Sequence, residues 1–282
     1  MKASGKLLNC IDNLPGFPKV LFRIRSIATD PRSTLTDLVQ AIKTDPIFTA
    51  RLLRLANSAY IGLPNSVSSV HNAVVLLGRK RIAGLAVISY GLQMSVDAPR
   101  VFSLRNFWRH CLAVGILSES IARHCLRYEA IDAEELFTAG TLHDIGMLVL
   151  AHAAPEHVRH IAESAGQAKR PFFALEPHES SHQVMGMVAA RQWRLPEVLA
   201  HTIRYHHTPL ESEVNSRQVA IVHLADSMAK MVGLTTLEND AVVLPEKKAM
   251  ALIPLPDERL RVIARKALED QKEIESLIDA LF

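Results

Sequence analysis

The sequence predicts an all-α protein, and three observations carry that prediction. Leu, Ala, Ile, Arg and Glu are abundant, a balance that favours helices. Strict alternation of polar and apolar residues, which is typical of half-buried strands, is scarce. Residues that cap helices recur ahead of apolar segments with helical spacing. Because 49% of the 282 residues are hydrophobic, the chain can bury a substantial core and is not of the disordered class.

Capping motifs divide the first part of the chain into helices. A stiff, proline-containing opening at residues 14–18 leads into a first helix at about residues 20–24. Thr34 and Asp37 have the spacing of a capping box ahead of the second helix. Asp45-Pro46 places an N-cap residue and a proline at the start of the third helix, which we expect to end near residue 56.

A loop rich in Asn, Ser, Gly and Pro follows at residues 57–66. Ser68-Ser69 offers a cap for a helix at residues 70–77, and Gly78 separates that helix from the next apolar run. We expect Asn57-Ser58 to form an ordered contact between the N-terminal helices and the helical core that follows them, because the preceding helix is apolar on adjacent faces. The alternative is an ordinary helix end with Asn57 near the C-cap.

Asp97-Ala98-Pro99 marks the expected boundary between two helical parts. We expect an N-terminal helical subdomain at residues 1–98, a core at residues 99–233, and a connector with C-terminal helices at residues 234–282. Within the core, helices are expected after Ser103, after Asp132, over residues 181–193, from Pro196 to His206-His207, and over residues 218–232.

Charge and cysteine usage limit the class of protein. The formal net charge is only +3, and a nucleic-acid partner is not expected, because such binders concentrate basic residues in a stripe. We interpret Arg79-Lys80-Arg81, and Arg51 with Arg54, as solvated helix faces. Cys10, Cys111 and Cys125 form no CxxC motif, which favours a reducing compartment. No secretory or membrane-spanning segment is evident, so we expect a cytoplasmic protein with no membrane partner.

The pair His143-Asp144, in the run Thr141-Leu142-His143-Asp144-Ile145-Gly146, is the most informative feature of the sequence. An imidazole beside a carboxylate in an apolar helix is costly to desolvate unless something such as a cation compensates it. Other ligand-type residues lie in segments predicted to be helices or helix ends. The candidate metal ligands are His110, His143, Asp144, His182, His206, His207 and Asp226.

Seven such groups exceed the four ligands of a structural zinc. They fit one or two transition-metal ions, with Asp144 as the natural bridge, and mixed His and carboxylate ligands suit Fe or Mn best. Chance proximity is the alternative, because the chain has 13 histidines. His201 and His223 lie near the candidate ligands in sequence and could orient them. The remaining histidines are interpreted as surface residues: His71, His124, His152, His157, His160 and His178.

His110, His143-Asp144 and Asp226 resemble the H…HD…D pattern of the HD superfamily of metal-dependent phosphohydrolases, and His182 with His206-His207 resembles the longer ligand set of its HD-GYP branch. Several other motifs resemble the HDOD family, over about residues 10–232. These are Leu14-Pro15, Asp45-Pro46, residues 52–59, Ser68-Ser69-Val70, Leu76-Leu77-Gly78, Trp108-Arg109-His110 and residues 139–146. The resemblance implies an N-terminal helical subdomain packed on an HD-like multi-helix core, in a bacterial signalling module.

Three positions depart from the active HD-GYP pattern. Met147 stands where those enzymes carry a lysine, Thr208-Pro209 replaces their GYP-containing loop, and Asn106 stands where a glutamate ligand often lies. We therefore expect a cytoplasmic signal-transduction protein that retains a metal centre, with an unknown protein or a nucleotide-type ligand as its partner. The alternative is an active phosphohydrolase acting on a nucleotide or cyclic dinucleotide. Asp144 with a metal-bound water would then be catalytic, and Lys80, Arg109 or Arg204 would replace the missing lysine.

Overall fold

The computed structural model describes residues 19–59, 61–63, 66–96, 101–125, 131–238, 240–269 and 271–281. Throughout these ranges the regular structure is helical and contains no strand, which confirms the predicted fold class. The chain divides into two compact units. The larger unit comprises residues 1–16 and 97–268, and the smaller unit comprises residues 17–96 and 269–282. The expected opening at residues 14–18, Cys10 and the Asp97-Ala98-Pro99 boundary lie outside the described residues.

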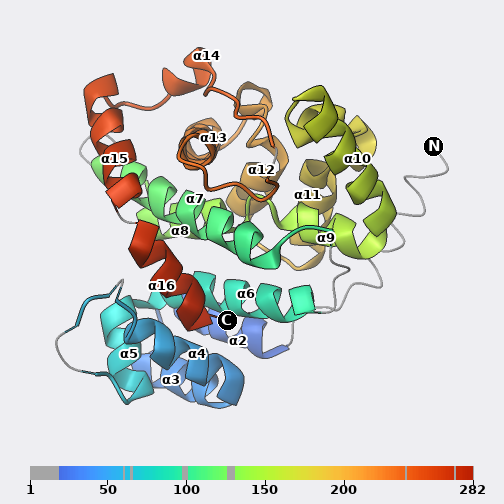
Figure 1. Ribbon diagram of the computed structural model, residues 1–282. Coiled ribbons are helices and arrows are strands. Elements are labelled where there is room, and N and C mark those ends of the chain that lie inside the picture. Colours follow the sequence, from blue (N-terminus) through green and yellow to red (C-terminus); the bar gives the residue numbers. More distant parts are fainter. Residues whose placement is uncertain are drawn as a thin grey trace. The chain divides into compact units, whose positions relative to one another are not determined.

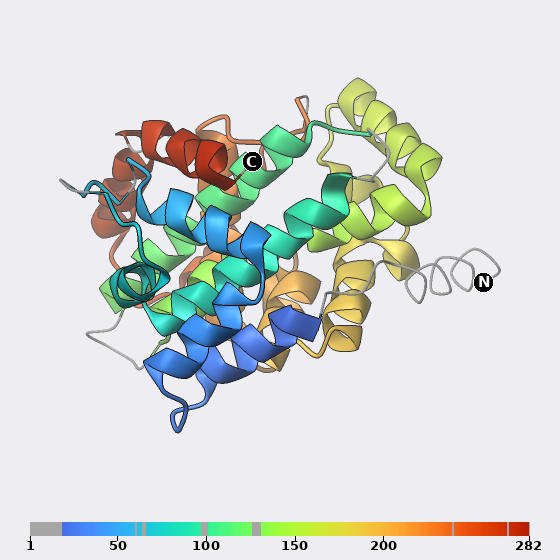
Figure 2. The same cartoon turned by 90° about the horizontal axis from the view of Figure 1, so that it is seen from below.

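The smaller unit is a cluster of six helices in its described residues. They are α2 (Lys19–Thr29), α3 (Leu35–Lys43), α4 (Pro46–Ala56), α5 (Val70–Leu77), α6 (Arg79–Val96) and α16 (Gln271–Leu281). In this unit α2 packs on α3 and α6, while α4 contacts α3, α5, α6 and α16 (Figure 1). Figure 2 shows α16, the last helix of the chain, beside α4 from a second direction.

The predicted caps are present in the smaller unit. The Thr34 side chain accepts from the backbone N–H of Asp37, whose carboxylate accepts from the N–H of Thr34, so the capping box is confirmed. Asp45 caps α4 through the N–H of Phe48 at 2.9 Å, and its other oxygen accepts from the Tyr90 hydroxyl at 2.5 Å. This second bond ties the start of α4 to α6.

Asn57 lies at the C-cap of α4, as the alternative reading of this loop has it. Its carboxamide braces the loop by donating to the carbonyls of Leu53 (2.7 Å) and Val67 (2.8 Å) and accepting from the N–H of Val67 (2.6 Å). Farther along, the N–H of Ala59 donates to the hydroxyl of Ser276 in α16. The loop is thus fastened within the smaller unit, and its expected contact with the core at residues 99–233 stays a prediction.

Two arginines of the expected basic faces have structural roles. Arg79 donates to the carbonyl of Ile27 near the end of α2 (2.6 Å) and to the carbonyl of Ser33 in the segment after α2 (2.7 Å). Arg51 donates to the carbonyl of Ser89 at 2.6 Å. Both side chains are half-buried. The interpretation of these two residues as solvated was wrong, because their guanidinium groups donate to main-chain carbonyls within the smaller unit.

The larger unit carries all the candidate ligands. Its α-helices are α7 (Leu104–Cys125), α8 (Ala133–Leu142), α9 (Ile145–Ala153), α10 (Pro155–Ala168), α11 (His182–Gln192), α12 (Glu197–Tyr205), α13 (Ser216–Met231), α14 (Lys247–Met250) and α15 (Asp257–Glu269). Short 3-10 helices are η1 (Phe172–Leu175), η2 (His178–Ser180) and η3 (Pro209–Glu211). Here α7 packs along α8 and α13, and α11 lies between α9 and α12 (Figure 1).

Two expectations about these helices were wrong. His143-Asp144 is not inside a helix, since α8 ends at Leu142 and α9 begins at Ile145. In addition, α10 occupies a segment for which no helix was expected, although Val158, Ile161 and Ala165 have helical spacing and are buried. Pro155 at its first turn and the left-handed Lys169 at its end explain the boundaries of α10.

One stretch of the described residues, 133–153, is long and apolar enough to be a candidate membrane span by length and composition. Its mean hydropathy is 1.2, and 89% of the tested window is buried inside the fold. The stretch comprises α8, the His143-Asp144 turn and α9. Its apolar character is therefore accounted for by the core of the larger unit.

Candidate metal centre

The break between α8 and α9 frees the side chains of His143 and Asp144. Asp144 occupies the N-cap position of α9, yet its carboxylate makes no capping hydrogen bond. At Gly146 a Cβ atom would meet the carbonyl oxygen of His182 at 1.8 Å, so only glycine allows the start of α9 to approach the start of α11 this closely. The close approach brings the Asp144 and His182 side chains together.

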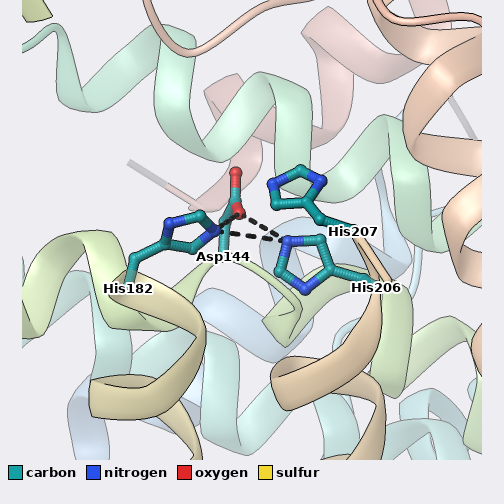
Figure 3. Close-up of side chains that lie close together, drawn as sticks. All are labelled: Asp144, His182, His206 and His207. Carbon is teal, nitrogen blue, oxygen red and sulfur yellow. Dashed lines mark hydrogen bonds and ion pairs between the residues drawn. The ribbon is translucent and has the colours of Figure 1, made fainter. Parts of the chain in front are cut away.

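Asp144 lies at the centre of the cluster. Its Oδ1 is 3.4 Å from Nε2 of His182 and 3.3 Å from Nε2 of His206, and His207 completes this group (Figure 3). Its Oδ2 is 3.6 Å from Nε2 of His110 and 3.4 Å from Nε2 of His143. The two oxygens therefore face two different sets of imidazoles, which is the arrangement a bridging carboxylate requires.

Asp226 of α13 completes the second group. Its Oδ1 lies 3.2 Å from Nε2 of His110 and 3.8 Å from Nε2 of His143. All seven predicted residues are thus gathered into two adjoining groups, Asp144 with His182, His206 and His207, and His110 with His143 and Asp226. In each group the possible ligand atoms lie within 4.8 Å of one another. That these residues bind metal stays a prediction.

Hydrogen bonds fix the tautomers of three imidazoles. The Nδ1 atoms of His110, His143 and His206 lie 2.8, 2.7 and 2.9 Å from the backbone carbonyls of Leu234, Gly140 and Ile203. A carbonyl only accepts, so each Nδ1 carries a proton, and each ring, when it is neutral, turns an Nε2 lone pair towards the carboxylates. Metal-binding histidines are commonly oriented in this way.

The facing atoms leave a place for a cation. Two Nε2–Nε2 pairs, His110 with His143 and His182 with His206, are each 3.3 Å apart. Oδ1 of Asp226 is buried and has no hydrogen-bond partner among the described residues. Donors that share one ion at about 2.0–2.2 Å lie about 3.0–3.4 Å apart at octahedral to tetrahedral angles. The residues present therefore fit a transition-metal ion in their donor types, orientation and spacing.

Without a cation the cluster has strongly perturbed protonation. Burial lowers the pKa of His206 to about 4, and it holds the pKa of His207 well below its ordinary value. For His182 burial acts in the same sense, but Glu176 and Asp144 outweigh it and raise the pKa to about 10. Burial disfavours the charged form of Asp144, yet the neighbouring histidines hold its pKa well below the usual range.

Further residues orient the cluster from outside. Glu176 accepts from Nδ1 of His182 at 2.5 Å and from its backbone N–H at 2.8 Å. His223 donates from Nδ1 to the carbonyl of His206 at 2.7 Å, and its Nε2 accepts from the N–H of Glu246. Because both ring nitrogens of His223 are engaged, it supports the backbone of a candidate ligand. Nothing in the sequence analysis indicated Glu176.

Lys230 is the second residue that sequence reasoning missed. Its buried ammonium donates to Oδ2 of Asp226 at 3.1 Å and lies 3.8 Å from Oδ2 of Asp240. The signal was available, since Lys230 stands four residues after Asp226 and so shares its helical face. Burial alone would lower the pKa of Lys230, but Asp226 and Asp144 outweigh that effect and raise it.

The void over the cluster is small. Its volume is about 20 Å³, which is room for about one water molecule. Met147 and Lys230 both line it, and the Phe173 ring covers one side by stacking on His207 with the ring centroids 3.9 Å apart. The void is thus closed to a substrate of nucleotide size in this conformation.

Other candidates do not join the cluster. His201 lies 3.6 Å from Glu197 and packs against Tyr205. His124 bonds to the carbonyl of Ser120, one turn away on its own helix. Of the cations proposed to replace the missing lysine, Arg204 packs on the Tyr205 ring and Lys80 belongs to the smaller unit. Among the described residues, the cation that lines the void is Lys230.

Comparison with known families assigns this architecture. The model of the HDOD domain matches residues 14–209, which is more than half of the chain. The chain belongs to the HDOD family. The match covers six of the seven candidate ligands, while Asp226, Lys230 and three residues that line the void, Thr236, Leu237 and Asp240, lie beyond it.

Relatives of this HDOD protein share its fold at low identity. A protein of Treponema pallidum (strain Nichols), described as uncharacterized, is 28% identical over 213 residues. That similarity covers 73% of this chain but 40% of the relative, so the chain spans less than half of the relative's length. No function passes from that relative to this chain.

Three solved structures have the same fold. An HDOD domain protein of Geobacter sulfurreducens (TM-score 0.78) and a proposed phosphohydrolase of Shewanella amazonensis (TM-score 0.77) are each 22% identical, and each similarity covers 98% of both chains. A proposed signal transduction protein of Marinobacter aquaeolei has a TM-score of 0.80 at 19% identity, over 95% of this chain and 60% of that one. At these identities the likeness concerns the fold.

Proposed function

We propose that this HDOD protein is a cytoplasmic signal-transduction module with a His/Asp metal centre that regulates rather than turns over a substrate. One observation carries the metal assignment. Three imidazoles hold Nδ1 to a carbonyl and turn Nε2 towards two buried carboxylates, an arrangement that is repulsive for neutral rings unless a cation lies between the facing atoms. The description of the Marinobacter aquaeolei protein as a signal transduction protein agrees with this role.

The bridge position of Asp144 favours two ions. Its Oδ1 faces His182 and His206, while its Oδ2 faces His110 and His143. Iron or manganese suits this mixture of imidazole and carboxylate ligands best. A bound ion of this kind would supply Lewis acidity and an activated water.

Metal analysis of the purified protein tests the proposal. We expect one or two equivalents of Fe or Mn, and we expect Asp144→Ala to empty the site, because it removes the carboxylate that faces both groups. Asp257→Ala is the control, since Asp257 is exposed in the first turn of α15. Equal metal content in Asp144→Ala and the control would reject the metal centre.

Phosphoester hydrolysis is the second candidate function, and Lys230 is the observation that favours it. Its ammonium group lies beside the void, where an enzyme of this class needs a cation to stabilise charge on phosphoryl oxygens. The description of the Shewanella amazonensis protein as a proposed phosphohydrolase agrees with this alternative. The size of the void opposes it, since about 20 Å³ excludes a phosphoester.

A further inference from the structure

A second cavity lies within the larger unit, beside the candidate metal centre. Its volume is about 440 Å³, within the range of about 300–1,000 Å³ that is typical of small-molecule sites. Thr236, Leu237 and Asp240 line both this cavity and the small void over the cluster. We call these three residues the shared wall, because they line the cavity on one side and the small void on the other.

Two polar groups of the cavity lining have no partner in the described part of the chain. The carboxamide of Asn106 makes no hydrogen bond there, although the backbone N–H of the same residue bonds to Ser103. The hydroxyl of Thr236 is buried and unpartnered. A carboxamide presents one donor and one acceptor side by side. It therefore pairs with a ligand edge that offers the reverse arrangement, as an adenine edge does to asparagine.

The apolar part of the lining suits a planar ring. Phe102, Leu237 and Ala162 contribute to it. The Phe102 ring packs against the Phe107 ring, whose centroid lies 5.6 Å away at an interplanar angle of 34°. A supported aromatic face stacks on flat heterocycles.

The charges of the lining disfavour an anionic ligand. Its one cation, Arg159, is paired with Glu156. Asp240 is also engaged, because its carboxylate accepts from the N–H of Phe172 and faces Lys230. The exposed carboxylates of Glu163 and Glu238 remain, and they would repel a phosphate.

We propose that this cavity binds an uncharged planar heterocycle with adjacent donor and acceptor groups, such as a nucleoside or an aromatic amide. Asn106 reads the polar edge and Phe102 stacks on the ring. The site is distinct from the metal cluster, and the binding step does not depend on the proposed metal centre.

Calorimetric titration of the full chain tests the binding step. Adenosine, guanosine, uridine and nicotinamide are titrated into metal-free protein, with AMP and spermidine as charged comparators. We expect saturable binding of at least one uncharged compound, with AMP about tenfold weaker than adenosine. Asn106→Ala should weaken binding about tenfold, because it removes two hydrogen bonds. Asn72→Ala, an exposed asparagine of the smaller unit, is the matched control and should leave affinity unchanged.

Thr236→Val is a second control, placed in the shared wall. Valine has nearly the shape of threonine and lacks the enclosed, unpartnered hydroxyl, so the unfolding temperature should be unchanged or higher and ligand affinity should stay the same. Three outcomes would overturn the proposal. These are no saturable binding of any uncharged compound, tighter binding of AMP or spermidine than of every uncharged compound, and full affinity in Asn106→Ala.

The shared wall also connects the cavity to the cluster. Leu234, two residues before Thr236, accepts from Nδ1 of His110, and Asp240 faces the ammonium of Lys230, which in turn bonds to Asp226. A bound heterocycle should therefore change the affinity of the cluster for metal, and metal should change ligand affinity by the same factor. This second step rests on the proposed metal centre.

The connection is tested by a Mn²⁺ titration followed by electron paramagnetic resonance, with and without saturating ligand. Equal Mn²⁺ affinities with and without the heterocycle would overturn the connection. Failure of the metal centre itself would appear as no Mn²⁺ binding in either titration.

Discussion

The ammonium group of Lys230 compensates charge that the cluster would otherwise leave unbalanced. It is buried, and it donates to Asp226 at 3.1 Å. We expect Lys230→Met to lower the free energy of unfolding of the metal-free protein by about 3–5 kcal/mol, the usual cost of breaking a buried ion pair from one side. The loss should be smaller with metal bound, because the ion then compensates Asp226. Denaturant titrations with and without metal measure the difference, and equal losses in both forms would contradict this role.

Glu176 acts on the cluster through His182. Its carboxylate accepts from Nδ1 of that histidine, so it fixes the ring and makes Nε2 a better donor to metal. We expect Glu176→Gln to weaken metal binding by about 10–100-fold, the usual effect of removing such a partner. Competition with a chelating dye measures the affinity. Glu179→Gln, in the adjacent 3-10 helix η2, serves as the control. If Glu176→Gln bound metal as tightly as the control does, the proposed effect of Glu176 on His182 would be contradicted.

At the scale of elements, the contact between the starts of α9 and α11 positions Asp144 against His182. In a free helix, a change from glycine to alanine is stabilising by about 1 kcal/mol. At Gly146 we expect the opposite sign, a loss of about 1–3 kcal/mol or more, because the added Cβ overlaps the carbonyl oxygen of His182. Gly146→Ala should also lose metal, since α11 must shift. Thermal unfolding combined with metal analysis checks both, and a stabilised variant with full metal content would refute the packing argument.

The helices themselves were largely predictable, because their caps are local. Thr34 with Asp37, Asp45 and Ser69 each cap the helix that the sequence assigned to them. The break at His143-Asp144 was not predictable in the same way. No proline marks it, the N-cap residue Asp144 makes no capping hydrogen bond, and the apolar run continues through it. It is set by the tertiary approach of α9 to α11, and contacts of that kind have no local signature.

The candidate site, too, could be predicted from the sequence only in part. The seven ligand-type residues were found from their chemistry and order, and the structure brings all of them together. Glu176, Lys230 and Asp240 were missed because ordinary surface helices and connectors carry the same residue types. Only the packing of η1 and the segment after α13 shows that Glu176 and Asp240 lie around the cluster, whereas the four-residue spacing of Lys230 from Asp226 was a local signal.

At the scale of the whole molecule, the fold closes the cluster more completely than a phosphodiesterase allows. The larger unit assembles it from α7, the α8–α9 turn, α11, the end of α12 and α13. It then covers the cluster with η1 and the shared wall, which leaves about 20 Å³. Binding of a bulky phosphodiester would require these covering segments to move.

We therefore expect hydrolysis of cyclic dinucleotides to be weak or absent even when metal is bound. Phosphoryl oxygens need electrostatic stabilisation as charge develops on them, and loss of one such group typically costs about 10²–10³ in rate. Met147 cannot supply it, and the ammonium of Lys230 lies between the carboxylates of Asp226 and Asp240, which compete with a phosphate for it. The assay measures turnover by iron- and manganese-loaded protein under reducing conditions. Rates comparable to those of a dedicated phosphodiesterase, abolished in both Asp144→Ala and Lys230→Met, would replace the regulatory function with an enzymatic one and would show that the covering segments open during turnover.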